Sequence, residues 1–86
     1  LRQKTAPLRK KANKLEQQIS QWQEQLAEVE ALLAETDIYQ AEQKAKLAQC
    51  IQQQAKLKQD IEEVEMEWLA LEEEIEEQIE TIKAQS

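Results

Sequence analysis

The sequence predicts an all-α fold in which two helices form an antiparallel coiled-coil hairpin, and three observations support this prediction. Apolar residues recur in alternating steps of three and four along two segments of the chain. This average spacing of about 3.5 residues keeps a narrow stripe of one helix facing a partner helix. The spacing is interrupted once, around residues 35–40. The chain also contains no glycine and one proline, which argues against a turn-rich sheet protein.

The first predicted helix runs from about Ala6 to Ala34. Pro7 fits its first turn, where the N–H that proline lacks has no partner inside the helix. Most of its residues are Ala, Leu, Glu, Gln and Lys, which all favour helices. Its apolar stripe consists of Leu8, Ala12, Leu15, Ile19, Trp22, Leu26, Val29 and Leu33.

The predicted connection covers residues 35–40. Thr36 and Asp37 are strong N-cap types, because their side-chain oxygens accept the free N–H groups at a helix start. We expect Ile38 and Tyr39 to fold back over the end of the stripe. The second helix is then predicted from about Gln40 to Lys83, and its stripe consists of Leu47, Cys50, Gln54, Leu57, Ile61, Val64, Trp68, Leu71, Ile75, Gln78 and Ile82.

The charge distribution favours an antiparallel arrangement within one molecule. Residues 1–14 carry six basic residues and no acid, whereas residues 60–80 carry eleven acidic residues and no base. A parallel dimer would place the acidic segments side by side, so a monomer is expected. If the chain folds about residue 38, facing residues have numbers that add up to roughly 76. This sum stays constant along the rod because both helices rise by the same distance per residue. This register predicts the neighbours Leu8 and Trp68, Leu15 and Ile61, Leu26 and Cys50, Trp22 and Gln54, and Leu1 and Ile75.

The residue inventory excludes most catalytic chemistry. Without glycine the chain has no phosphate-binding loop, and without histidine it has no Ser-His-Asp arrangement or ordinary zinc site. We therefore expect no catalytic, cofactor-binding or metal site in this chain. The single cysteine, Cys50, cannot form an intrachain disulfide, which fits the reducing cytoplasm. Its position on the apolar stripe indicates a small packing residue. No apolar run is long enough to span a membrane, and the start at Leu1 indicates a fragment of a larger protein.

Two groups of basic residues and one aromatic are candidate contacts for nucleic acid or another partner. The first group is Lys44, Lys46, Lys56 and Lys58, near the connection, and the second includes Arg9, Lys10 and Lys11. Tyr39 in the connection is either a plug or a contact residue. The alternative for both basic groups is an ordinary solvated face, with the acidic stretch neutralising the second group. The net charge of −7 argues against tight duplex binding, which depends on cations displacing counterions.

Four segments of the chain resemble the C-terminal coiled-coil domain of bacterial ABC-F ATPases of the Uup and YheS groups, with YheS the more similar. The segments are Thr5–Lys11, the Glu-Thr-Asp-Ile-Tyr connection at 35–39, Leu47–Ala55 and Glu65–Leu69. The resemblance implies a soluble parent with two ATPase cassettes that bind ATP and magnesium, and a role around the ribosome or translation. None of the catalytic motifs of that family falls on these residues.

The preferred interpretation is thus a non-catalytic arm that contacts the ribosome or its RNA, or modulates the parent's own cassettes. Two alternatives stay open at this point. One is a DNA-binding accessory domain, as the Uup resemblance implies, and the other is a purely structural or dimerising coiled coil. No membrane partner is expected.

Overall fold

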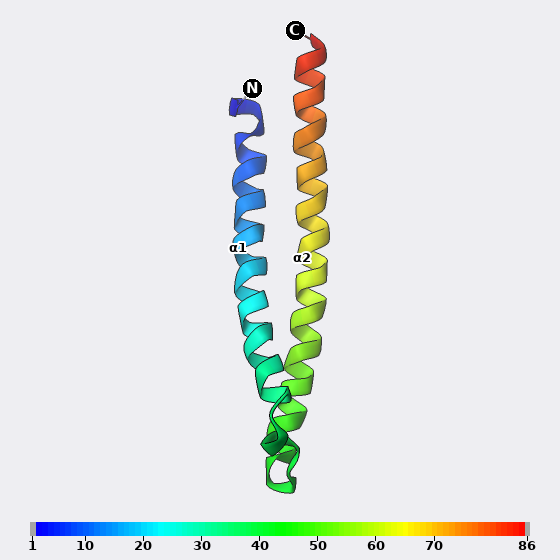
Figure 1. The fold of residues 1–86 in the computed structure, drawn as a ribbon. Helices are drawn as coiled ribbons and strands as arrows, with labels where there is room; N and C mark the ends of the chain where they lie inside the picture. Colours follow the sequence, from blue (N-terminus) through cyan, green and yellow to red (C-terminus); the bar gives the residue numbers. More distant parts are fainter. Residues whose placement is uncertain (1, 86) are drawn as a thin grey trace.

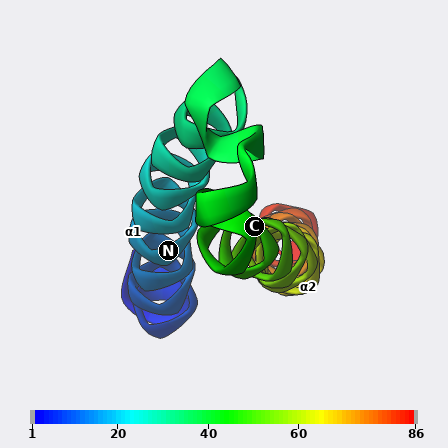
Figure 2. The same cartoon turned by 90° about the horizontal axis from the view of Figure 1, so that it is seen from below.

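The computed structural model describes residues 2–85 and confirms the all-α hairpin. Helix α1 spans Arg2–Leu33 and helix α2 spans Lys44–Gln85. The two helices run antiparallel along each other, and α2 extends past α1 at the end where both termini lie (Figure 1). The molecule is a rod of 68 × 15 × 14 Å. Viewed end-on, the axes of the two helices are inclined to each other rather than strictly parallel (Figure 2).

The predicted apolar stripes form the contact between the helices. Seven of the eight buried apolar residues lie on these stripes: Ala12, Val29, Cys50, Leu57, Ile61, Leu71 and Ile75. Apart from Ile61, the eight buried apolar residues form two clusters rather than one continuous core. The cluster near the connection contains Val29, Ile38, Cys50 and Leu57, and the cluster near the termini contains Ala12, Leu71 and Ile75. Each helix buries one narrow face, as the 3.5-residue spacing requires.

Both helices are longer at their outer ends than the sequence predicts. Helix α1 starts at Arg2 instead of Ala6, so Pro7 lies inside the helix rather than in its first turn. Proline at this position removes one backbone hydrogen bond near the helix start. Helix α2 continues to Gln85, past the predicted end at Lys83.

The connection differs most from the prediction, because it continues through residue 43 instead of ending at 40. Two 3₁₀ turns, η1 (Thr36–Tyr39) and η2 (Ala41–Gln43), separate the helices. Thr36 and Asp37 are therefore inside η1 and do not cap α2, which begins at Lys44. Ile38, within η1, is the buried residue of the connection. Its side chain is 4% exposed and packs into the cluster of Val29, Cys50 and Leu57, as predicted for this residue.

The longer connection shifts the register of the hairpin by about two helical turns. A hydrogen bond from Gln54 Nε2 to Glu30 Oε2 (3.3 Å) joins facing positions whose numbers add up to 84, not 76. The fold axis thus passes near residue 42, within η2, rather than near residue 38. Gln54 consequently bonds to Glu30, and the predicted pairing of Gln54 with Trp22 is wrong. Leu8 and Trp68 both pack against the cluster of Ala12, Leu71 and Ile75, but they do not face each other as predicted. Trp68 lines a depression with Glu16. The predicted pair of Leu1 and Ile75 lies outside the described residues.

Spin labels can measure this register directly. Asn13 and Glu72 line one depression, whereas the register predicted from sequence would place Asn13 beside Glu63. We expect a label pair at 13 and 72 to give a shorter distance than a pair at 13 and 63, because nine residues along a helix are about 13 Å. Dilute samples measured by electron paramagnetic resonance restrict the readout to one molecule. A shorter distance for the 13–63 pair would restore the predicted register.

Candidate nucleic-acid interface

Four lysines, which we call the tip lysines, lie on the part of α2 nearest the connection: Lys44, Lys46, Lys56 and Lys58. All four are exposed, and residues 44–58 contain no acidic residue. Helical geometry puts Lys44 and Lys58 on one flank, since they are two heptads apart. Lys46 lies on the opposite edge of the apolar stripe, and Lys56 lies further round the helix. The structure therefore spreads the tip lysines around α2 instead of gathering them into one patch.

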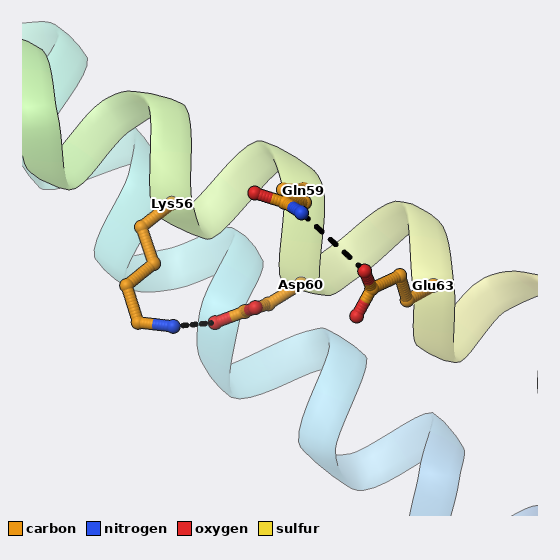
Figure 3. Close-up of polar contacts among 4 residues, drawn as sticks. All are labelled: Lys56, Gln59, Asp60 and Glu63. Atoms are coloured by element: carbon orange, nitrogen blue, oxygen red, sulfur yellow. Dashed lines mark hydrogen bonds and ion pairs between the residues drawn. The ribbon is translucent and has the colours of Figure 1, made fainter.

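Lys56 is the one tip lysine engaged in an ion pair. Its Nζ lies 3.2 Å from Asp60 Oδ2, one turn along α2 (Figure 3). The Lys56 side chain is 77% exposed, so water screens this pair and its contribution to stability is small. Next to it, Gln59 Nε2 donates a 3.5 Å hydrogen bond to Glu63 Oε1. Lys56 thus keeps a carboxylate beside it, whereas no ion pair within residues 2–85 involves Lys44, Lys46 or Lys58.

Tyr39 combines a structural contact with an exposed ring. Its hydroxyl donates a 2.6 Å hydrogen bond to the carbonyl oxygen of Leu33, the last residue of α1. Carbonyls in the last turn of a helix have no partner within the helix, so this bond satisfies one of them. The side chain nevertheless remains 60% exposed. Tyr39 is therefore anchored at its polar tip while its ring stays accessible, in contrast to the buried Ile38 beside it.

Arg9, Lys10 and Lys11 lie near the opposite end of the rod from the connection, so they do not form one site with the tip lysines. All three are exposed. Arg9 Nε donates a 3.2 Å hydrogen bond to Thr5 Oγ1, one turn earlier on α1. Arg9 also lines a depression together with Glu72 and Glu76 of α2.

The acidic half of α2 lies beside this basic end of α1, as the charge distribution predicts. Lys4, for example, lines a depression with Glu74 and Glu77. No ion pair between α1 and α2 is found among the described residues. The acids therefore lower the positive potential around Arg9 to Lys14 at a distance, through screened Coulomb interactions, rather than by direct contact.

The described part of the chain offers no alternative chemistry. Between residues 2 and 85, no group of three His, Cys, Asp or Glu side chains is arranged to hold a metal ion. Cys50 is buried in the apolar cluster near the connection. Over the same residues, neither helix has the length and apolar character needed to cross a bilayer.

A comparison with protein families assigns the hairpin. A family model described as the ABC transporter C-terminal domain matches residues 5–73, which is most of the chain. The chain belongs to the ABC transporter C-terminal domain family. The range matched by this family includes the connection, the tip lysines and nearly all of α1, and it ends inside the acidic half of α2. No curated protein and no solved structure matches the chain.

Membership of the ABC transporter C-terminal domain family identifies the chain as an accessory arm of an ABC protein and not as a catalytic module. The two candidate basic groups lie at separate ends of the 68 Å rod.

Sequence reasoning missed one feature of this family member. Met66 and Leu69 are large apolar residues that lie off the α2 stripe, and they are 66% and 53% exposed. Their position between acidic residues, in the segment Glu65-Met-Glu-Trp-Leu69, was the available signal. An apolar side chain that fits neither the stripe nor a turn indicates a second surface on the helix.

Proposed function

We propose that this ABC transporter C-terminal domain is the arm of a cytoplasmic ABC-F ATPase of the Uup and YheS type, with YheS the nearer group. In this proposal the arm contacts ribosomal RNA or another ribonucleoprotein surface through the tip lysines. The supporting observation is the segment of α2 from Lys44 to Lys58, which has four exposed lysines and no acid. It occupies the end of a 68 Å rod that is farthest from the termini.

The rod geometry supports the connecting end as the contact. If the ATPase cassettes precede this chain, they join it at the end where α1 begins (Figure 1). The connection then projects away from them and can reach a separate surface. Lys44, Lys46 and Lys58 carry no ion pair in the described structure, so their charges are available to phosphate groups.

ATP and magnesium belong to the cassettes in this proposal, not to the arm. The chain has no glycine for a phosphate-binding loop, and its described residues offer no metal-binding cluster. Duplex DNA is a weaker candidate than RNA in a folded ribonucleoprotein, because the net charge of −7 opposes nonspecific binding along a long polyanion.

Reversing the charge of the tip lysines tests this proposal. Replacing Lys44, Lys46, Lys56 and Lys58 by Glu should weaken ribosome association of the parent protein. It should also flatten the slope of log affinity against log salt by about 3, if all four contact phosphates. Co-sedimentation with ribosomes across a salt series measures both.

A matched variant reverses four lysines at the opposite end: Lys4, Lys10, Lys11 and Lys14 to Glu. It changes the net charge by the same amount and leaves the connecting end intact. The proposal predicts wild-type association for this control. Equal loss in both variants would show an effect of total charge, and unchanged association of the tip variant would remove the tip lysines as contacts.

A further inference from the structure

One flank of the hairpin carries an acidic surface, and Lys58 at its edge is the one tip lysine that borders it. Three shallow depressions follow one another along this side of the contact between the helices. The first is lined by Leu26, Met66 and Leu69, and the second by Ser20, Gln23 and Trp68. Glu65 lines both, so these two are adjacent. The third, lined by Asn13 and Glu72, lies about one turn further along α2.

The residues of α2 on this flank repeat in their own steps of three and four. They are Glu62, Glu65, Leu69, Glu72 and Glu76, with Met66 beside them; we call this set the acidic flank. The spacing defines a second stripe next to the one that packs on α1. It covers 15 residues, or about 21 Å of helix, which is the length of four helical turns.

The acidic flank exposes apolar surface that the hairpin itself does not use. Met66 is 66% exposed and Leu69 is 53% exposed, and both lie in the first depression. On the α1 side the second depression has Ser20 and Gln23, which are small or flexible polar residues. A further helix can therefore lie along the groove and cover Met66 and Leu69.

The charge of this flank decides which kind of helix fits. Glu62, Glu65, Glu72 and Glu76 line the depressions, and Glu16 adds a carboxylate from α1. None of these carboxylates is in an ion pair within residues 2–85. Bases line the depressions only near the two ends of the series, with Lys58 in the first and Arg9 in the third. The flank attracts cations and repels phosphate.

We propose that the acidic flank binds a basic amphipathic helix of a partner protein. The apolar stripe of that helix covers Met66 and Leu69, and its Lys or Arg side chains approach Glu62, Glu65, Glu72 and Glu76. This is the helix-in-groove form of recognition. The proposal does not require the contact proposed for the tip lysines, and Lys58 is the one residue that the two surfaces share.

A second copy of this chain does not fit the acidic flank. Six of the eleven basic residues lie on α1, where no large apolar residue is exposed among the described side chains. Four others are the tip lysines of α2, beside which Ile51 is the one large apolar residue that is exposed. A copy of α1 could therefore supply charge but could not cover Met66 and Leu69. A symmetric pairing through Met66 and Leu69 would instead bring two acidic flanks together, which is unfavourable.

Titration of the 86-residue chain with a synthetic peptide tests this proposal. The probe is an 18-residue helix with Leu in steps of three and four and Lys at the other positions. Two matched peptides serve as controls, one with Glu in place of Lys and one with the Leu and Lys residues shuffled. We expect the amphipathic Lys peptide to bind, with amide chemical-shift changes in the nuclear magnetic resonance spectrum concentrated on residues 62–76, and the Glu peptide not to bind.

Two variants of the chain separate docking from simple charge attraction. The double variant Met66→Gln, Leu69→Gln should weaken binding of the Lys peptide by about tenfold, since it removes the exposed apolar contacts. Ile51→Gln is the matched control, because Ile51 is 51% exposed on the same helix but outside the acidic flank, and its binding should be unchanged. All these residues are exposed, so the variants should fold.

Three results would overturn the inference. The shuffled peptide could bind as tightly as the amphipathic one, or the double variant could bind the Lys peptide like the wild type. The third result is that light scattering shows a dimer and that Met66 and Leu69 are protected in this dimer. A second copy of the chain would then be the occupant.

Discussion

Replacing Leu57 by Ala should destabilise the hairpin by about 2–5 kcal/mol, the range for removing a buried Leu side chain. Leu57 is 6% exposed and contacts the cluster of Val29, Ile38 and Cys50. The loss is large for this fold because each helix buries only one stripe, so few other contacts compensate. Urea denaturation followed by circular dichroism at 222 nm measures the change in the free energy of unfolding.

Ile51→Ala is the control for this experiment, since it removes a large aliphatic side chain from the same helix at a site that is 51% exposed. We expect a change within about 0.5 kcal/mol, because Ala also favours the helix more than Ile does. Similar losses in the two variants would mean that the stripe through Leu57 does not form the core.

Replacing Ile38 by Asp should cost about 3 kcal/mol or more and should open the connecting end first. Ile38 is 4% exposed and is the one residue of the connection that reaches the cluster of Val29, Cys50 and Leu57. The substitution removes its buried apolar surface and places a carboxylate beside apolar side chains without a partner. Amide hydrogen exchange should then accelerate in the last turn of α1 and the first turn of α2 before it changes elsewhere.

Gln40→Asp places the same carboxylate two residues further along the connection, at an exposed position. It should leave both the free energy of unfolding and the exchange rates close to those of the wild type. If Ile38→Asp behaves like this control, Ile38 does not hold the connection and the longer turn needs another explanation.

The candidate contacts illustrate what a sequence can and cannot locate. Their exposure follows from the stripe, because residues off the apolar ladder face solvent, and the tip lysines, Arg9, Lys10 and Lys11 are indeed exposed. Their grouping does not follow. Lys56 has an ion pair with Asp60, and the hydroxyl of Tyr39 bonds to Leu33, because each side chain finds a partner that only the folded backbone brings within reach.

The acidic flank was hidden for a related reason. Met66 and Leu69 lie off the apolar stripe, so the stripe alone places them in solvent and gives them no partner. The depressions beside them arise between two helices, so their position depends on which residues of α1 lie opposite. The identity of those residues depends on the register.

The sequence by itself determined that this chain forms two helices and which face of each is buried, because a spacing of about 3.5 residues has that one structural consequence. Tertiary structure decided the register and the length of the connection. A heptad pattern places apolar residues opposite apolar residues in registers that differ by a whole heptad. The observed sum of 84 differs from the predicted 76 by about one heptad, so the pattern alone does not distinguish the two registers. Packing of Ile38 into the cluster near the connection selects one register, with the turn continuing through residue 43 and Glu30 facing Gln54.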